Sequence, residues 1–410
     1  MDYLVHQLEN KIRIIYKPSS SNISHACILL NAGSRDESLE MSGMAHFIEH
    51  LLFKKTSKRN TSQILNRLEL VGGDLNAYTT KEYTCIHASF LNQHLERSLD
   101  LFEDLVFHSL FPTDEMQKEK EVILDEITSY QDQPEEAIND DFEDLIFSGH
   151  PLGRNILGTP ETVKAFKQTD IFDFIDSNYN TDEIVIGVLG NYDFKKLIRM
   201  SEKIYGAIPY KSIKRQRAGK TNYQPQTIKL LKPINQAHCV MGNEAFSAHH
   251  ESKMGLLLLN NVLGGNGMSS RLNLEIREKH GIAYTIESNY SPLSDTGIFS
   301  IYFGTDPEKT DKALKLIHKE LKKLREIKLG SIQLHQAKQK FIGQIALGEE
   351  NRIGLITAMA KSLLDYNRVE SLEVIYAKVN AISADEILEI ANTVFEPSKL
   401  SMLLFEPQES

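Results

Sequence analysis

The spacing of apolar and polar residues in the first half of the chain predicts several β-strands. Residues 3–16 alternate weakly around a turn, as is typical of a hairpin. The apolar run at residues 25–31 predicts a further strand, and residues 75–90 alternate as a pair of strands does. Residues 183–190 are strongly apolar, which favours a strand that is buried on both faces.

Between these strands, apolar residues recur with the period of an α-helix. Gly72-Gly73 follows the second of the expected helices and ends it, and Pro134 marks the break after the last one. Strands and helices therefore alternate through this half of the chain. The expected helices cover residues 42–53, 61–71, 92–110 and 113–130.

A short repeat indicates that the chain contains an internal duplication. Ala77-Tyr78-Thr79 follows a predicted helix and its terminal glycines, and Ala283-Tyr284-Thr285 follows a helical stretch that ends near Gly281. Between the two halves, residues 209–226 are rich in basic and small polar side chains and poor in apolar ones, as linkers are. We therefore predict an N-terminal domain, a linker and a homologous C-terminal domain, which cover residues 1–210, 211–226 and 227–410.

The distribution of charge distinguishes the two halves. The whole chain has a net charge of −10, of which residues 1–210 carry −14 and the remainder +4. The apolar content of 41% and the charged content of 25% are those of a globular protein, which excludes a disordered or fibrous chain. Because a strong basic footprint is missing, the chain is not expected to bind nucleic acid. An acidic half is compatible with a cavity that attracts basic or neutral partners.

Cysteine usage and the N-terminal residues bear on location. Cys27, Cys85 and Cys239 are scattered, odd in number and outside any C-x-x-C motif, so a reducing compartment is favoured. The first residues lack the basic and apolar regions of a signal peptide. No apolar run approaches the roughly 18 residues that a transmembrane helix needs. We expect a cytoplasmic protein that is not embedded in a membrane.

The segment His46-Phe47-Ile48-Glu49-His50 carries the most specific chemistry in the sequence. Residues four apart lie on one face of a helix, so His46 and His50 can present two imidazoles to one metal ion, with Glu49 beside it. This is the inverted H-x-x-E-H form of a zinc helix, and a catalytic zinc needs one more protein ligand and an open position. Histidine pairs of this spacing also occur by chance on exposed helices. The apolar residues around this pair instead indicate a buried helix, where two imidazoles and a carboxylate need partners.

A third ligand is expected from an acidic helix further along the chain. Glu119 and Glu126 are seven residues apart, two helical turns, on the helix predicted over residues 113–130, so they share a face. One of them could bind the metal while the other orients a histidine or a water. The spacing alone does not distinguish this arrangement from an acidic helix that faces solvent.

With these residues the chain resembles the H-x-x-E-H zinc peptidases of family M16, which include pitrilysin, insulysin and the mitochondrial processing peptidases. The resemblance implies the fold of a short, two-domain bacterial-type member. Such a fold is α+β, with two homologous domains that each contain a mixed, largely antiparallel sheet covered by helices. Beyond the zinc helix and Glu126, the resemblance rests on residues 33–37, 76–79, 150–154 with Gly158, 268–272 and 277–284.

The resemblance implies a role for each residue that matches the zinc site. His46, His50 and Glu126 would bind one Zn²⁺ ion per chain. Glu49 would be the general base that deprotonates a metal-activated water, which makes the chain a metalloendopeptidase. Glu119 would support catalysis without being an obligatory ligand.

The resemblance also implies how substrate and partner bind. Asn76 and Ala77 would lie on an edge strand to which an extended peptide adds as a further strand. Arg277 and Tyr284 match a pair that reaches a zinc site from a different domain, where it contacts substrate and supports catalysis. Two-subunit members of the family close four domains as a clamshell, so a homodimer is expected, although a homologous subunit could replace the self-partner. Short or unfolded peptides would be the substrates.

Other interpretations stay open from the sequence. Some members of the family are non-catalytic structural or assembly subunits, and a further form would bind peptides and keep zinc for stability. The intact set of His46, Glu49, His50 and Glu126 argues against the first of these. The acidic run at residues 132–144 is typical of a solvated face, although it could instead select basic peptides.

Overall fold

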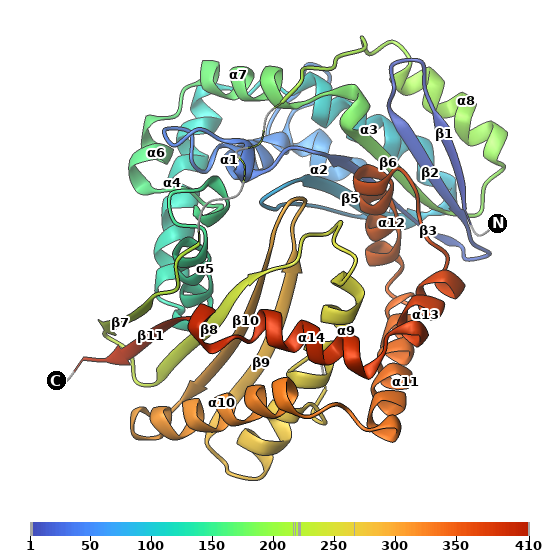
Figure 1. Cartoon of the computed structure of the whole chain (residues 1–410). Coiled ribbons are helices and arrows are strands. Elements are labelled where there is room, and N and C mark those ends of the chain that lie inside the picture. The colour runs from blue at the N-terminus through green and yellow to red at the C-terminus, as the bar shows by residue number, and fades with distance from the viewer. Residues whose placement is uncertain (1–2, 216, 218, 220–222, 266, 409–410) are drawn as a thin grey trace. The chain divides into compact units, whose positions relative to one another are not determined.

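The structure of the chain is a computed structural model that describes residues 3–215, 217, 219, 223–265 and 267–408 (Figure 1). The chain divides into two compact units, and each unit is assembled from three separate segments. Each unit has its own β-sheet and its own apolar core. The first unit comprises Met1–Ile127, Arg154–Arg217 and Leu347–Ser371, and the second comprises Thr128–Gly153, Ala218–Ala346 and Leu372–Ser410.

The first unit is built on a six-stranded mixed sheet. The strand order is β1-β2-β6-β3-β5-β4, in which β2 and β6 run parallel and the other neighbours run antiparallel. All seven residues of β6 are buried, as the apolar run at residues 183–190 predicts. The strands β1 to β6 span Leu4–Gln7, Arg13–Pro18, Ile23–Leu30, Asp74–Thr79, Thr84–Leu91 and Ile184–Gly190.

Helices cover both faces of this sheet, because successive residues of a strand point to opposite sides. Ile14 and Ile186 face a core that they share with α1, α2 and α3, whereas their neighbours Ile15 and Val185 face α12. An apolar layer therefore forms on each face of the sheet, between the strands and the helices that cover them. The helices are α1 (Met44–Leu52), α2 (Thr61–Glu69), α3 (Leu95–His108), α4 (Thr113–Gln131, up to Ile127 in this unit), α6 (Pro160–Ala165), α7 (Gln168–Asn178), α8 (Phe194–Tyr205) and α12 (Arg352–Tyr366).

The second unit repeats this topology with five strands. The order β7-β11-β8-β10-β9, with β7 and β11 parallel and the rest antiparallel, matches β2-β6-β3-β5-β4 of the first unit. The shared topology supports an internal duplication. The repeated tripeptide is not its structural signature, because Ala77-Tyr78-Thr79 ends β4 whereas Ala283-Tyr284-Thr285 begins β9. Strands β7 to β11 span Thr227–Lys232, Ala237–Ala245, Ala283–Pro292, Gly297–Thr305 and Ser401–Pro407.

Helices also cover both faces of the second sheet. One face shares a core with α9, α10 and α14, and α5 packs on the other face against β8 and β11. Together the two units confirm the predicted α+β class, in which each of two similar units has a mixed sheet covered by helices. The helices of this unit are α5 (Pro134–Ile146), α9 (Lys253–Leu263), α10 (Thr310–Glu326), α11 (Ser331–Gly348, up to Ala346 in this unit), α13 (Leu372–Ala381) and α14 (Ala384–Val394).

The division into units differs from the contiguous domains predicted over residues 1–210 and 227–410, because two helices are exchanged. Helix α5 lies in the first half of the sequence but packs in the second unit, where Ile138 and Phe142 join the core of β8 and β11. Helix α12 lies in the second half but covers β3 and β6 of the first unit. Helical periodicity shows that a helix has an apolar face, but it does not show which sheet that face covers.

The predicted linker at residues 211–226 begins as an anchored strap. Arg217 donates to both carboxylate oxygens of Asp36, at 2.9 and 3.0 Å, and Arg215 lies 3.3 Å from the same carboxylate. Asp36 has a side chain with 0% exposure, so these ion pairs are buried. Arg215 and Arg217, which by composition belong to a linker, therefore fix this part of the chain to the first unit. Gln216, Ala218 and residues 220–222 of the predicted linker lie outside the described residues.

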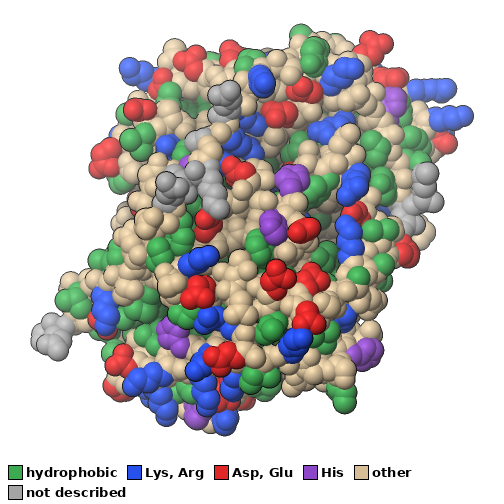
Figure 2. All heavy atoms as spheres, in the orientation of Figure 1, with side chains coloured by type: hydrophobic (Ala, Val, Ile, Leu, Met, Phe, Trp, Pro, Cys, Tyr) green, Lys and Arg blue, Asp and Glu red, His purple; other side chains and the backbone are tan. Residues whose placement is uncertain are grey.

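The surface carries charges of both signs. On the face shown in Figure 2, Lys and Arg side chains are interspersed with Asp and Glu side chains. None of the helices that the structure describes is both long enough and apolar enough to cross a lipid bilayer.

Candidate metal centre

Helix α1 carries the two histidines of the H-x-x-E-H segment and is held in place by its apolar residues. Phe47, Ile48 and Leu51 are fully buried in the core of the first unit. His46 and His50 are one turn apart on this helix, and their ring centroids are separated by 4.6 Å with an angle of 65° between the planes. The packing of the helix therefore fixes the position of two neighbouring imidazoles.

A buried glutamate fixes the N-terminus of this helix. Glu37 accepts hydrogen bonds from the backbone N–H groups of Gly43 at 2.9 Å and Ala45 at 2.8 Å. These N–H groups have no partner within the helix, and the two oxygens of the Glu37 carboxyl group satisfy them. Burial raises the pKa of Glu37 to about 8, although the two hydrogen bonds and Arg154 act in the opposite direction. Glu37 is not among the residues that the sequence predicts for the site.

Glu126 reaches the two histidines from α4. Its Oε2 atom lies 3.9 Å from Nε2 of His46 and 3.6 Å from Nε2 of His50. One ligand atom from each of the three residues lies within 4.8 Å of the other two. The structure thus brings together the three side chains that the sequence and the family resemblance name as metal ligands.

The chemistry and spacing of this group suit a zinc ion. The gaps between nitrogen and oxygen exceed hydrogen-bond length, so the side chains face one another without bonding directly. Donor atoms about 2.0–2.1 Å from one zinc ion are separated by roughly 3.4 Å in a tetrahedron, which is close to the gaps observed. Burial, with the neighbouring His50, lowers the pKa of His46 to about 3, so its imidazole is neutral and keeps a lone pair for a metal.

Glu119 lies behind His50 rather than among the possible ligands. Its Oε2 atom accepts a hydrogen bond from Nδ1 of His50 at 3.2 Å, and its Oε1 atom lies 2.6 Å from Nζ of Lys54. The two acidic residues that share a face of α4 therefore differ in position: Glu126 faces both Nε2 atoms, and Glu119 contacts one Nδ1 atom. The sequence does not predict Lys54 for the site. Its only signal there is a lysine one helical turn after His50.

Glu49 contacts the edge strand β4. Thr79, the last residue of β4, donates a hydrogen bond from Oγ1 to Oε2 of Glu49 at 2.5 Å. Burial raises the pKa of Glu49, and the hydrogen bond from Thr79 acts against this increase. Asn76 and Ala77 lie on the same strand, where the amide of Asn76 donates to Asp74 at 2.9 Å. Within the described sheet, β4 is the last strand, so its outer edge has no neighbouring strand.

Arg277 and Tyr284 belong to the second unit. Arg277 lies in a π-helical turn, Asn273–Glu278, and its side chain is 3.9 Å from the carboxylate of Glu278. Tyr284 is the second residue of β9, is 58% exposed, and donates a hydrogen bond to Asp306 at 3.3 Å. Both side chains are therefore accessible on their own unit, and their action at a metal group stays a prediction.

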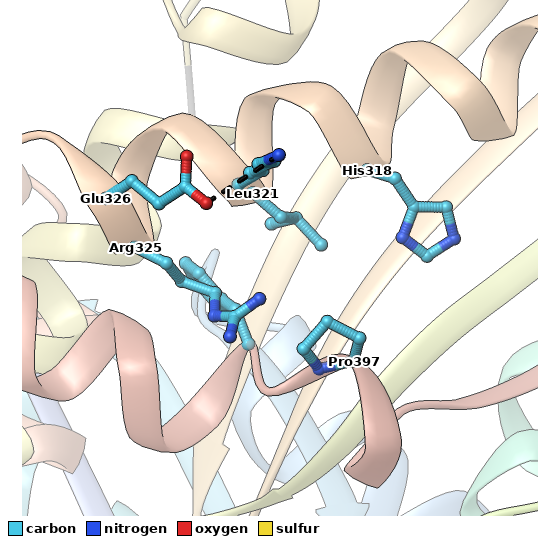
Figure 3. A pocket seen from close by; sticks show the side chains of 7 residues that line it. His318, Leu321, Arg325, Glu326 and Pro397 are labelled. Carbon is cyan, nitrogen blue, oxygen red and sulfur yellow. Dashed lines mark ion pairs between the residues drawn. The ribbon is translucent and has the colours of Figure 1, made fainter.

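The second unit also contains a cavity of about 330 Å³ beside α10 (Figure 3). Arg325 is held there by an ion pair with Glu396 at 3.0 Å. None of the residues that the sequence predicts for the site lines this cavity. The lining residues are His318, Leu321, Lys322, Arg325, Glu326, Phe395 and Pro397.

The chain combines two similar α+β units, and one of them carries two histidines and a glutamate that could hold a metal ion. The family pattern described as Insulinase (Peptidase family M16) matches residues 13–160, and the pattern described as Peptidase M16 inactive domain matches residues 165–341. The chain is 32% identical to an uncharacterized zinc protease of Bacillus subtilis, YmxG, over 94% of each chain. It is 33% identical to an uncharacterized zinc protease of Streptomyces coelicolor, over 90% of this chain and 81% of the relative. The chain therefore belongs to peptidase family M16.

Two crystal structures share this fold. A protease from Helicobacter pylori is 21% identical, covers 99% of both chains and has a TM-score of 0.91. A protein described as a peptidase M16 inactive domain, from Pseudomonas fluorescens, is 17% identical, with coverage of 100% of this chain and 99% of that one and a TM-score of 0.91. At these identities the similarity concerns the fold alone.

Proposed function

We propose that this chain is a zinc-dependent endopeptidase that cleaves short or unfolded peptides. The observation that carries the proposal is the group of His46, His50 and Glu126, with Glu49 on the same helix as the two histidines. Membership of family M16 supports a peptidase. The relatives in Bacillus subtilis and Streptomyces coelicolor are named zinc proteases, which supports zinc as the cofactor. We propose one ion per chain, held by the one such ligand group found among the described residues.

The residues of the first unit have distinct tasks in this proposal. His46 and His50, through Nε2, and Glu126, through a carboxylate oxygen, would hold the zinc. When bound, zinc acts as a Lewis acid and lowers the pKa of a bound water to about 7. Glu49 would accept a proton from the attacking water and deliver it to the leaving amine. Because Thr79 holds Oε2 of Glu49, we assign that proton to Oε1.

The edge strand β4 supplies a place for the substrate. An extended peptide would add to its outer edge, so that backbone hydrogen bonds provide affinity and few side chains are read. Asn76 and Ala77 lie on this strand, and Glu49 is joined to it through Thr79. A folded protein offers few free extended segments, which is the reason to expect short or unfolded peptides as substrates.

A second subunit would complete the site. By resemblance to two-subunit members of the family, Arg277 and Tyr284 would bind substrate at the partner's zinc site, and the Tyr284 hydroxyl would stabilise the oxyanion. This chain carries both the ligand set and this pair, which favours a homodimer over a pair of unlike subunits. We also propose a cytoplasmic location, because Cys27, Cys85 and Cys239 are free and buried, as is usual in a reducing compartment.

The test compares the wild-type chain with Glu49→Gln on a mixture of unfolded peptides while bound zinc is measured. We expect both proteins to hold zinc and only the wild type to cleave. The proposal fails if the wild type holds zinc and cleaves nothing, which would favour a structural subunit or a peptide-binding homologue. The ligand assignment fails if the wild type takes up no zinc when the metal is supplied.

A further inference from the structure

A lysine outside the ligand group completes the surroundings of His50. Glu119 lies between Lys54 and His50, and each of its carboxylate oxygens has one of them as its partner: Nζ of Lys54 at 2.6 Å from Oε1, and Nδ1 of His50 at 3.2 Å from Oε2. Only 7% of the Glu119 side chain is exposed. The carboxylate is therefore held at both ends, with little contribution from solvent.

This contact decides which nitrogen of His50 carries the proton. An ionised carboxylate only accepts hydrogen bonds, so Nδ1 of His50 must be the donor. In the tautomer that carries its proton on Nδ1, Nε2 is bare, and Nε2 is the atom that lies 3.6 Å from Glu126. The hydrogen bond to Glu119 thus selects the tautomer whose lone pair points toward the ligand group, as carboxylate partners of metal-binding histidines do.

His46 lacks an equivalent partner. Its Nδ1 atom is buried and has no hydrogen bond to any residue that the structure describes. Of the two imidazoles, His50 is therefore the one whose orientation a neighbouring carboxylate fixes. Whatever holds Glu119 in place acts directly on the geometry of the ligand group.

Lys54 is the group that holds it. Without the ammonium group, Oε1 of Glu119 would be a nearly buried anionic oxygen that lacks this partner, which is unfavourable. The carboxylate could then rotate toward water to regain a hydrogen-bond partner. This rotation would weaken its contact with His50.

We propose that Lys54 is a positioning residue that, by binding Glu119, fixes the tautomer and orientation of His50 for metal binding. The inference rests on the proposed function, because it takes His50 as a zinc ligand. Lys54 follows α1, which carries both histidines, whereas Glu119 comes from α4. The ion pair therefore also ties together the two helices that supply the ligands.

The test measures zinc affinity of the full-length chain by competition with a chelator. We expect Lys54→Met to bind zinc about ten-fold more weakly than the wild type, and Lys54→Arg to recover most of the affinity because it keeps the charge. The visible absorption spectrum of the cobalt-substituted protein should also change in Lys54→Met. In peptide cleavage, kcat should fall while KM changes little. In a Glu119→Gln background, Lys54→Met should add little further loss, because both residues act through one contact.

The same segment offers a matched control. Lys58 lies 2.7 Å from Glu103, and Glu103 also contacts His108 at 2.7 Å, so these residues form a second lysine–glutamate–histidine contact. Neither Glu103 nor His108 contacts the ligand group in the described contacts. Lys58→Met should therefore leave zinc affinity and the cobalt spectrum unchanged.

Equal zinc affinities and cobalt spectra for Lys54→Met and the wild type would overturn the inference, as would fully additive losses in the double variant. Thermal unfolding of the metal-free proteins checks that the variants fold. Should Lys54→Met not fold, Lys54→Gln is measured with the same expected direction. A wild type that binds zinc but cleaves nothing removes only the proposed function, since the affinity ratio still decides the role of Lys54. A wild type that takes up no zinc overturns both.

Discussion

Thr79 and Glu49 join the edge strand of the first sheet to the helix that carries the candidate metal ligands. The hydroxyl of Thr79 donates to the carboxylate of Glu49 across 2.5 Å. Thr79 is the last residue of β4, and Glu49 is one residue before His50. A peptide bound along β4 and a base on α1 would therefore keep a fixed relation to each other.

Substitution of Thr79 tests this connection. We expect Thr79→Val to lower kcat by roughly 10- to 100-fold, because a hydrogen bond to a charged group contributes about 1.5–3 kcal/mol and here orients the general base. Zinc affinity should not change, because Thr79 contacts no ligand. Thr79→Ser keeps the hydroxyl and should retain most of the activity. If the valine variant is as active as the wild type, Thr79 does not orient Glu49.

The cap of α1 by Glu37 predicts a pH dependence of stability. The pKa of Glu37 is about 8 in the folded chain, well above its usual value, so the folded state binds this proton more tightly than the unfolded state. The stability that this proton provides is complete below the usual pKa of a glutamate, near pH 4.5, and is lost as the pH rises through about 8. Each unit of difference in pKa corresponds to roughly 1.4 kcal/mol.

The measurement is the free energy of unfolding of metal-free wild type and Glu37→Gln between pH 5 and pH 9. Glutamine does not titrate, so the wild-type value should fall relative to that of the variant from pH 5 to about pH 8 and then level off. The metal-free form is used because zinc binding has its own pH dependence. Parallel curves for the two proteins would contradict the raised pKa.

The strap formed by residues 211–215 and Arg217 should stabilise the first unit. Arg217→Gln leaves the buried carboxylate of Asp36 without its bidentate partner, and we expect the free energy of unfolding to fall by roughly 3 kcal/mol in urea titrations. The matched control is Lys203→Gln, which breaks an ion pair with Glu96 on the surface, where the lysine side chain is 74% exposed. This control should show no measurable change. If Arg217→Gln lowers the free energy of unfolding no more than the control does, the strap does not stabilise the unit.

Mixing of inactive variants tests whether subunits share a site. Glu49→Gln removes the proposed base, and Tyr284→Phe removes the proposed oxyanion donor. If the pair on one subunit serves the zinc site of another, mixed dimers contain one site with both groups intact, and random mixing should restore about a quarter of the wild-type activity by counting of sites. Each variant alone serves as the control. Activity that stays at the level of the single variants would contradict a shared site.

The sequence predicts the histidine pair of the candidate metal group because its signal is local. His46 and His50 are four residues apart on one helix, and this spacing alone places their rings together. The choice between Glu119 and Glu126 is different, because both lie on the same face of α4 and only the packing of α4 against α1 separates their positions. Spacing therefore identifies the helix that supplies a third ligand, whereas the ligand itself comes from the family resemblance.

The remaining neighbours of this group depend on packing and have weak signals in the sequence. Glu37 caps α1 through a loop, and Lys54 contacts a carboxylate from another helix. Arg217 lies in a segment with the composition of a linker, yet its partner Asp36 lies 181 residues earlier in the chain. Strands such as β6 are predicted well because burial on both faces leaves a continuous apolar pattern.

The exchange of α5 and α12 between the halves of the sequence affects how the chain can be synthesised and divided. The first unit lacks the cover of one sheet face until residues 347–371 have left the ribosome, so its fold is completed late in translation. In the second unit, helix α5 is synthesised before any of the strands that it covers. A chain cut within residues 211–226 would yield two fragments that each expose an apolar sheet face and carry a helix without its sheet. Such fragments are expected to aggregate alone and to fold only when produced together.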